Sequence, residues 1–281
     1  MVQWNLSLYR GSCDCRPHGS QYQLRLTFDS SVIVCAHNEE RYIEGCLRSI
    51  VAQRVVPSQV IVVLDRCTDK TKDIAMGVLS GRGLLIEKDV QRWKHTISEN
   101  LEMARARATG QALAIIDADI TVPSNFLEQL LPQLKEYSSV SAVAKTDPSQ
   151  GLLNRAVSAW EYTYRFAPFG KEPRGGARVI LARDLAEVGG FHDVTSWDTD
   201  IDNRLRKSGH KVRLDASLSA LHRRKMNLRR SLSYQIEMGK ARRELGLSPS
   251  RSILHSIFRL RPFVIFGYVT GRKSGESSTK T

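Results

Sequence analysis

The sequence predicts an α/β fold in which helices flank an open, mostly parallel sheet. Short continuous apolar runs, typical of strands buried on both faces, alternate with segments whose apolar residues recur at helical spacing. Alternation of this kind favours a parallel sheet with right-handed crossovers. The 281 residues are 41% apolar and 25% charged, which is ordinary globular usage and excludes collagenous, low-complexity and disordered proteins.

The expected elements follow from the chain in order. Residues 32–36 form the first buried strand, and after a polar turn the apolar residues between 42 and 51 recur at helical spacing. Further buried strands are expected at 60–64, 84–86 and 112–116, with helices between them. A helix capped by Ser196 is expected to end before Gly209, and a short strand follows at 211–214. The predicted domain covers 30–222, and residues 1–29 form an extension whose role the sequence does not indicate.

The cysteines and the N-terminus favour a cytoplasmic protein. Five cysteines, an odd number without repeated spacing, do not make a disulfide framework, so we expect free thiols. Cys13, Cys15 and His18 lack a second ligand pair at zinc-site spacing, so no metal is expected there. The N-terminus does not resemble a secretory signal, and no apolar stretch reaches the roughly 18 residues of a membrane span.

The positive charge lies mainly at the C-terminus. From His222 onward there are 14 basic and 3 acidic residues, a net charge of +11, so the first 221 residues carry only +2 of the total of +13. Residues 223–271 are expected to form basic amphipathic helices that dock on a polyanionic surface, with an interfacial apolar run at 262–269. The alternative is that this region packs on the domain or on a second subunit. Residues 272–281 are expected to be disordered.

Polar and acidic residues follow three of the predicted strands. Because ligands of open α/β sheets bind beyond the carboxyl ends of the strands, these residues should gather at one rim. Clustered carboxylates repel one another unless a cation or hydrogen-bond donors lie between them, so a metal and a nucleotide are expected. The residues are His37, Asn38 and Glu39 after the first strand, Asp65 after the second, and Asp117, Ala118 and Asp119 after the fourth.

Four segments, taken together and in this order, resemble family 2 glycosyltransferases of the GT-A fold. They are VIVCAHNEERYIEGCLRSI, VIVVLDRCTDKTKDIA, ALAIIDADITVPSNFLEQLL and GGFHDVTSWDTDIDNRLRKSGHKV. The resemblance covers residues 32 to about 222. It implies a GT-A domain with a nucleotide-binding half at 30–120 and an acceptor half at 121–222. It also implies an inverting enzyme that uses a UDP- or GDP-linked sugar and Mg²⁺ or Mn²⁺.

The resemblance implies the residues of the donor site. Glu39 would accept hydrogen bonds from ribose or base, although it would also suit the first turn of the following helix, whose dipole it stabilises. Asp119 would hold the metal together with Asp117, which could instead reach the ribose or a metal-bound water. His222 would be a further ligand; it matches by position only, and a structural histidine is the alternative. The alternative for Asp117 and Asp119 is that they are two solvated aspartates at the end of a strand, without a metal. The implied donor-binding residues are Ala36, Asn38, Glu39, Asp65, Lys94, Asn100, Asp117, Ala118 and Asp119.

The acceptor side departs from the family in one place. The family's Glu-Asp pair reads Trp197-Asp198 here, so Asp198 matches the general base while the Trp197 ring would offer a flat face for stacking. Asp200 is the alternative base, and a helix cap is the alternative role for Asp198. Asp202 and Arg204 are expected to form a charge pair on the same helix. The loop glycines Gly175 and Gly176 would let the acceptor approach the backbone, or would be ordinary turn residues.

The resemblance implies transfer of a sugar to an acceptor hydroxyl or lipid phosphate, and the basic tail favours a peripheral enzyme on the cytoplasmic face of the membrane. A sugar nucleotidyltransferase is disfavoured because no glycine-rich phosphate loop follows the first strand. A catalytically inactive relative that docks on anionic lipid or RNA stays open because Trp197 replaces a glutamate. Nucleic acid is not an expected partner, since the domain lacks interleaved aromatic and basic residues.

Overall fold

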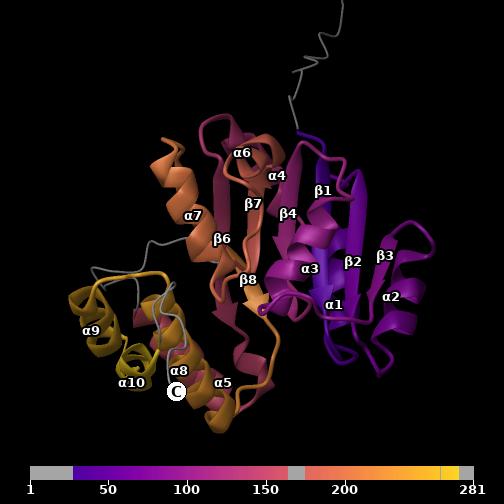
Figure 1. The fold of residues 1–281 in the computed structure, drawn as a ribbon. Coiled ribbons are helices and arrows are strands. Elements are labelled where there is room, and N and C mark those ends of the chain that lie inside the picture. Colours follow the sequence, from indigo (N-terminus) through magenta and orange to yellow (C-terminus); the bar gives the residue numbers. More distant parts are fainter. Residues whose placement is uncertain (1–27, 164–174, 260, 272–281) are drawn as a thin grey trace, which may run out of the picture.

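The computed structural model describes residues 28–163, 175–259 and 261–271 and shows an eight-stranded mixed sheet flanked by helices (Figure 1). The expectations for the N-terminal extension, for Cys13, Cys15 and His18, and for residues 272–281 lie outside the described residues. The strands run in the order β3-β2-β1-β4-β7-β6-β8-β5. Their bounds are β1 Ser30–Ala36, β2 Gln59–Asp65, β3 Leu84–Lys88, β4 Ala112–Ile116, β5 Ile120–Thr121, β6 Ser139–Thr146, β7 Ala177–Leu181 and β8 Val212–His222.

The sheet is mostly parallel, as predicted. Four of its seven pairings are parallel, and these include all three within the first half, β3-β2-β1-β4. Strands β5 and β7 pair antiparallel with their neighbours. Their partners lie far away along the chain, and no local sequence pattern indicates the direction in which these strands run. The predicted short strand at 211–214 is instead the start of β8, which continues to His222 with an irregularity in its register.

Helices cover both faces of the sheet. Along β1 the side chains alternate: Val32 and Val34 pack in the cluster under α1, and Ile33 packs in the opposite cluster under α3 and α7. The α-helices are α1 Ile43–Val51, α2 Thr71–Leu79, α3 Thr96–Arg105, α4 Phe126–Leu130, α5 Leu152–Thr163, α6 Ala182–Glu187, α7 Trp197–Lys207, α8 Leu228–Glu244, α9 Pro249–Phe258 and α10 Phe263–Thr270. Two 3-10 helices, η1 and η2, span Leu131–Lys135 and Pro148–Gln150.

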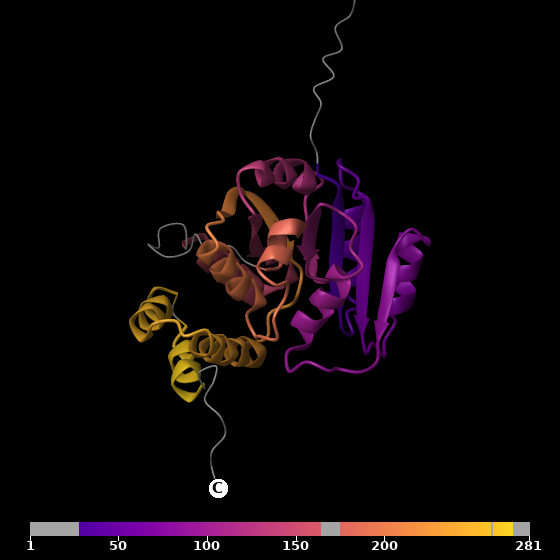
Figure 2. The ribbon, with the colours of Figure 1, turned by 45° about the horizontal axis from the view of Figure 1, so that its top comes forward.

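The C-terminal helices α8, α9 and α10 form a group at one side of the sheet (Figures 1 and 2). Two glycines allow α8 and α10 to touch backbone to backbone. A Cβ on Gly267 would lie 2.0 Å from the Ile236 carbonyl oxygen, and a Cβ on Gly239 would lie 2.2 Å from that of Val264. One side of the apolar run at 262–269 is therefore buried against α8, while Phe266 on the other side is 57% exposed.

None of the helices within the described ranges is both long enough and apolar enough to cross a bilayer. The cysteines that lie in these ranges, Cys35, Cys46 and Cys67, are free thiols. Burial raises the pKa of Cys35 and Cys46 above its ordinary value, and the carboxylates of Asp117 and other acidic residues add to the effect. These thiols are therefore inert packing groups rather than nucleophiles.

Candidate active site

The parallel strands bring the predicted rim residues to one edge of the sheet. The ends of β1 and β2 are in register at Ala36 and Leu64, and β4 runs beside β1. The turns that follow these strands therefore lie side by side at the lower edge in Figure 1. The buried residues Ala36 and Ala118 line this edge with little side chain.

The turn after β1 is cross-linked to the turn after β2. Asn38 has a left-handed backbone with φ of 54°, a conformation that asparagine tolerates. Its side-chain oxygen accepts a hydrogen bond of 2.8 Å from the backbone N–H of Thr68. The backbone N–H of Glu39 donates to Thr71 Oγ1 at 2.7 Å. Asn38 therefore fixes the turn that presents the Glu39 carboxylate to the rim.

Asp65, at the end of β2, is 1% exposed and is held by several donors. Its carboxylate accepts hydrogen bonds from Arg66 Nε at 2.8 Å, Thr96 Oγ1 at 2.5 Å and Asn100 Nδ2 at 3.1 Å. Burial acts to raise the pKa of Asp65, but these bonds and the nearby Lys88 ammonium outweigh it and lower the pKa to about 2. Asp65 is therefore ionised and rigid at neutral pH.

Lys88, at the end of β3, is the buried cation of this network, and the sequence interpretation passed over it. Its ammonium is 2.8 Å from Glu99 Oε2 and donates to Asn100 Oδ1 at 2.7 Å. Glu99 also accepts from the backbone N–H of Arg92 at 3.0 Å. Glu99 thus neutralises a lysine of the chain itself. A lysine directly after an apolar strand is the one sequence signal that points to such a pair.

Lys94 and Asn100, both predicted to bind the donor, occupy different surroundings. Asn100 is buried and bonds to Lys88 and Asp65. Lys94 is exposed, and its ammonium lies 3.5 Å from Glu244 at the end of α8. The structure therefore does not bring Lys94 to the carboxylate rim.

The two aspartates after β4 differ sharply in their charge state. Burial raises the pKa of Asp117 to about 7, with contributions from the carboxylates of Asp119 and Asp198, while His222 and Arg224 act in the opposite direction. Burial also acts to raise the pKa of Asp119, but His222 and Arg224 outweigh it and lower the pKa to about 2. At neutral pH Asp119 is therefore fully ionised, whereas Asp117 is partly protonated.

The end of β8 brings His222 to the same place. Its Nε2 is 3.2 Å from Asp119 Oδ2, close to the roughly 3 Å separation of adjacent ligands on a divalent ion with bonds of about 2.1 Å. Carboxylate oxygens suit Mg²⁺, and a mixed carboxylate and imidazole set also suits Mn²⁺. Asp119 and His222 therefore fit two ligand positions of a divalent metal, whereas Asp117 does not complete a three-ligand cluster with them within the described residues.

The glycine pair connects this centre to α7. The backbone N–H of Gly175 donates to Asp198 Oδ2 at 3.1 Å, and the carbonyl of Gly176 accepts from the N–H of Asp117 at 2.9 Å. A Cβ on Gly176 would lie 2.6 Å from Asp117 Oδ2, and one on Gly175 would lie 2.6 Å from the Trp197 ring. Both positions therefore require glycine because other groups approach the backbone closely.

Asp198 lies in the first turn of α7, beside the aspartate pair. One carboxylate oxygen accepts from Gly175, and the other accepts from the N–H of Thr199 at 2.8 Å. Ser196 is the N-cap residue of α7, but its side chain makes no capping hydrogen bond. The helix N-terminus and the Gly175 N–H together orient the Asp198 carboxylate.

The prediction that Trp197 offers a stacking face is wrong for this structure. Trp197 is only 8% exposed and belongs to the core under α7. Its ring contacts Phe191 edge to face at 5.7 Å between centroids, and the Arg178 guanidinium lies 5.7 Å from the ring centre. The large ring buries more apolar area in the core than it would on the rim, which is why it turns inward.

The predicted pair between Asp202 and Arg204 is also wrong. Asp202 pairs with Arg178 of β7, which is fully buried. Arg204 instead pairs with Asp200 at 2.6 Å, one helical turn earlier, and donates to the Gly190 carbonyl at 2.8 Å. Because the ion pair with Arg204 already occupies the Asp200 carboxylate, Asp198 is the better placed of the two candidate bases.

Arg224 is the rim residue that sequence reasoning missed. It follows β8 by two residues, and its guanidinium donates from Nη2 to Glu39 Oε1 and from Nε to Asp119 Oδ2. It also lies 5.1 Å from the centre of the Tyr42 ring. The sequence assigned Arg224 to the basic tail because nothing local distinguishes it from the neighbouring arginines.

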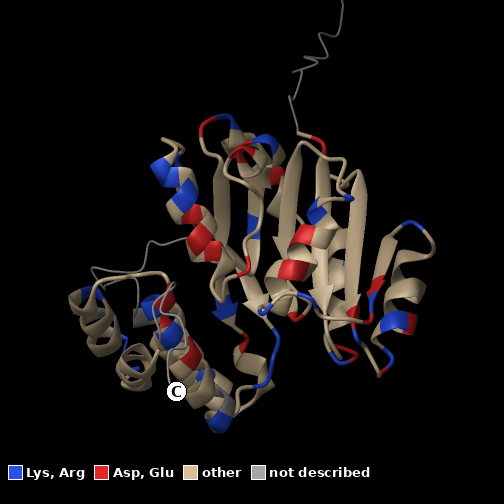
Figure 3. Cartoon of the chain, in the orientation of Figure 1, with Lys and Arg blue, Asp and Glu red and all other residues tan. Residues whose placement is uncertain are grey.

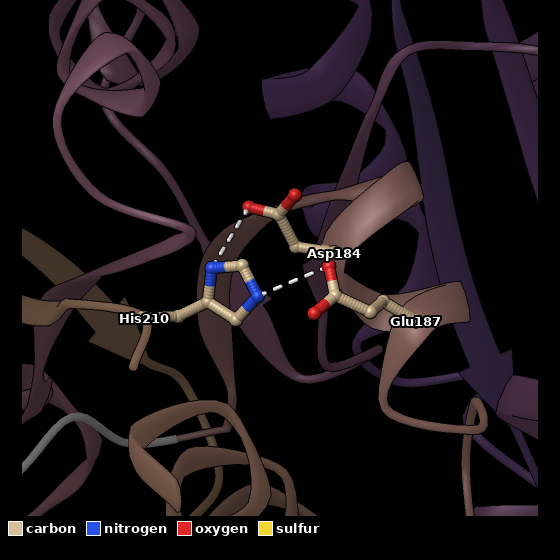
Figure 4. Close-up of side chains that lie close together, drawn as sticks. All are labelled: Asp184, Glu187 and His210. Atoms are coloured by element: carbon tan, nitrogen blue, oxygen red, sulfur yellow. Dashed lines mark ion pairs between the residues drawn. The ribbon is translucent and has the colours of Figure 1, made fainter. Parts of the chain in front are cut away.

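A second cluster of titratable side chains lies at the other end of the sheet (Figure 4). His210 is 3.7 Å from Asp184 and 3.3 Å from Glu187. These residues are close enough together to offer ligands to a metal. They adjoin the Leu181 end of β7, whereas Ala177 at its opposite end lies beside the aspartate pair. The cluster therefore ties α6 to the turn before β8 and is remote from the rim.

A model of the glycosyl transferase family 2 matches residues 31–184, which are more than half of the chain. EpsH of Bacillus subtilis (strain 168) is 30% identical over 103 residues, 36% of this chain and 29% of EpsH. Glycosyltransferase GlyA of Streptococcus pneumoniae is 29% identical over 121 residues, 40% of this chain and 16% of GlyA. The matched region thus spans less than a third of either relative.

Solved structures share the fold at low identity. Mannosyltransferase PcManGT from Pyrobaculum calidifontis, in complex with GDP-Man and Mn²⁺, has a TM-score of 0.63 at 21% identity, covering 87% of this chain and 74% of that one. Glucosyl-3-phosphoglycerate synthase from Mycobacterium tuberculosis, in complex with Mg²⁺ and UDP, has a TM-score of 0.55 at 19% identity, covering 78% and 76%. With the family match over β1 to α6, these findings establish that the chain belongs to the family 2 glycosyltransferases.

Proposed function

We propose that this protein transfers a sugar, with inversion, from a UDP- or GDP-linked donor to an acceptor hydroxyl or lipid phosphate. The observation that carries the proposal is the convergence of Asp117, Asp119, His222 and Asp198 at one sheet edge. The fold neighbours, solved with GDP-Man or UDP and with Mn²⁺ or Mg²⁺, support this class of donor. A catalytically inactive docking protein is not favoured, because the predicted base and metal ligands are all present.

The donor nucleoside would lie against the turns after β1 and β2. Asp65 is ionised and fixed by its hydrogen bonds, so it would accept hydrogen bonds from ribose or base hydroxyl and N–H groups. Glu39 is held by the turn that Asn38 fixes. It would also accept hydrogen bonds from ribose or base, from the turn after the neighbouring strand β1. Ala36 and Ala118 would leave room for the nucleoside.

The donor diphosphate would lie beside Asp117, Asp119 and His222. A bound Mg²⁺ or Mn²⁺ would neutralise the charge that develops on the leaving diphosphate. Asp119 and His222 would hold the ion, and Asp117, which fits against the backbone of Gly176, would reach the ribose or a metal-bound water.

The acceptor would be activated by Asp198. Its carboxylate takes the proton of the acceptor hydroxyl, whose oxygen then forms the bond to the anomeric carbon as the bond to the nucleoside diphosphate breaks. The Gly175 N–H and the N-terminus of α7 orient this carboxylate for the reaction. One displacement of this kind inverts the anomeric centre without a covalent enzyme intermediate.

Calorimetry with UDP, GDP and CMP, each with and without Mn²⁺, tests the proposal. We expect one of the uridine or guanosine nucleotides to bind in a Mn²⁺-dependent way, and Asp119→Ala to lose that binding because the fully ionised metal ligand is removed. Glu128→Ala removes a carboxylate of α4 that pairs with Arg54 at 3.2 Å and should bind like the wild type. Mn²⁺-independent binding, or equal loss in both variants, would contradict the proposed site.

We also propose that the C-terminal helices place the enzyme on an anionic membrane surface, where a lipid-linked acceptor would be available. Residues 223–271 contain 11 basic and 2 acidic residues, and several of the basic residues lie along α8 (Figure 3). Large apolar side chains are exposed beside them, among them Ile257, Phe266 and Val269. A basic surface with exposed apolar groups matches the requirements of interfacial binding.

Sedimentation with phosphatidylglycerol and phosphatidylcholine vesicles tests this docking. We expect binding to the anionic vesicles that weakens with added salt, because screening reduces the attraction of the basic residues. The double variant Phe266→Ser and Val269→Ser should bind about tenfold less, since two apolar contacts are lost. Val56→Ser, whose side chain is 77% exposed on the sheet domain, is the matched control. Equal binding of all variants, or equal binding to both lipids, would refute membrane docking.

A further inference from the structure

The Arg224 guanidinium contacts a carboxylate oxygen of the proposed metal site. It joins Glu39 of the turn after β1 to Asp119 of the turn after β4. The oxygen that it contacts, Asp119 Oδ2, is the same oxygen that lies 3.2 Å from His222. A guanidinium is always charged, so it offsets part of the negative charge of the two carboxylates without a metal. A metal ion that takes this oxygen therefore competes with Arg224 for it.

The backbone around Arg224 is fixed, so the side chain is the part that can move. The side chain of Asn154 donates to the Arg224 carbonyl at 3.2 Å and accepts from the N–H of Met226 at 2.8 Å. The N–H of Arg223 donates to the Asp119 carbonyl at 2.8 Å. These bonds hold the segment between β8 and α8, residues 223–227, against the rim from both sides. We call this segment the strap. Arg224 therefore remains at the rim when its side chain leaves Asp119.

A displaced guanidinium next to a divalent cation needs an anionic partner. The donor diphosphate supplies one, because its oxygens accept paired hydrogen bonds from a guanidinium fork. The ring of Tyr42, 5.1 Å from the guanidinium, offers a face along which the side chain can turn. Arg224 can thus pair with Asp119 when the donor site is empty and with the donor diphosphate when the site is filled.

We propose that Arg224 is the resident counter-ion of the donor site, which gives up Asp119 to the metal and turns to the donor diphosphate. This inference rests on the proposed function. It makes metal and nucleotide binding depend on each other: the metal alone must compete with Arg224, whereas the metal with a nucleoside diphosphate gives Arg224 a new partner. The two ligands therefore enter the site together rather than singly.

The proposal predicts changes of opposite sign in Arg224→Gln. Without nucleotide, Mn²⁺ should bind about tenfold more tightly than in the wild type, because the competing charge is gone. With saturating Mn²⁺, the nucleotide that the wild type binds, UDP or GDP, should bind about tenfold more weakly, because a charged hydrogen-bond donor is missing. Electron paramagnetic resonance of free Mn²⁺ measures the first constant, and calorimetry measures the second.

Arg223→Gln is the matched control. Arg223 is the adjacent arginine in the same strap, and it pairs with Asp147 at 3.0 Å, away from the rim. Both constants should stay within about twofold of the wild type in this variant. Arg224→Lys keeps the charge but loses the fork, so it should retain weak Mn²⁺ binding while nucleotide binding falls.

The outcomes separate this inference from the proposed function. If both affinities fall together in Arg224→Gln, or neither changes, Arg224 is a structural residue and the inference is wrong. If neither the wild type nor Arg224→Gln binds Mn²⁺, or if Asp119→Ala keeps the Mn²⁺ binding, the metal site itself is refuted and the inference with it. Opposite shifts in Arg224→Gln, with Arg223→Gln unchanged, support the exchange of partners.

Discussion

Replacing Asp198 by asparagine is expected to lower kcat by about 10²–10⁴-fold, the usual contribution of a positioned general base. The amide keeps the shape of the side chain, and its oxygen can still accept the hydrogen bond from the Gly175 N–H. It cannot take the proton of the acceptor hydroxyl. Nucleotide affinity should stay within about twofold, because Asp198 is expected to touch the acceptor rather than the donor.

Asp200→Asn is the control for this prediction. Asp200 lies in the same first turn of α7, but its carboxylate pairs with Arg204 at 2.6 Å. Its replacement should leave kcat within a few-fold of the wild type, as expected for a residue outside the reaction. The activity of both variants is measured under saturating donor and acceptor. An Asp198→Asn enzyme with full turnover, or an Asp200→Asn enzyme with the larger loss, would remove Asp198 from the proposed mechanism.

Lys88→Met is expected to lower the free energy of unfolding by about 3–5 kcal/mol, the typical cost of leaving one member of a buried ion pair without its partner. Lys88 and Glu99 are 4% and 6% exposed, and their charged atoms are 2.8 Å apart. Methionine fills a similar volume, so the loss reports the missing charge rather than a cavity. Urea unfolding at neutral pH measures the effect.

The loss of unfolding free energy in Lys88→Met should depend on pH, and the lowered pKa of Glu99 gives the direction. Burial acts to raise the pKa of Glu99, but the bond from Lys88 and those from the backbone of residues 92 and 93 outweigh it and lower the pKa. In the wild type this stabilisation is present above the ordinary glutamate pKa and is lost as the pH falls through the lowered value. The deficit of Lys88→Met should therefore be largest near neutral pH and shrink as the carboxyl becomes protonated.

Lys72→Met is the matched control for Lys88. Lys72 pairs with Glu87 at the same distance of 2.8 Å, but both side chains are about half exposed. Exposed pairs contribute at most about 1 kcal/mol, so this variant should unfold nearly as the wild type does. Equal losses in the two variants, or a Lys88→Met deficit that does not depend on pH, would show that the buried charge pair is not what stabilises this region.

The sequence by itself determined the half of the fold from β1 to β4 and the composition of the rim. Strands buried on both faces must be continuously apolar, so β1, β2 and β4 are visible as short runs. Parallel strands end at the same edge, so the polar residues that follow them necessarily gather there. The family resemblance then pointed to Asp198 and His222, and the structure places both beside the aspartate pair.

Only the tertiary structure decided which side chains pair with one another. Arg178 reaches Asp202 from β7 to α7, and Arg224 reaches Glu39 across 185 positions of the chain. Trp197 turned into the core, although its place in the motif suggested the rim. Periodicity reports only whether a position is buried, because that depends on local spacing along one element. The partner of a buried charge depends on which elements meet, and no local pattern carries that information.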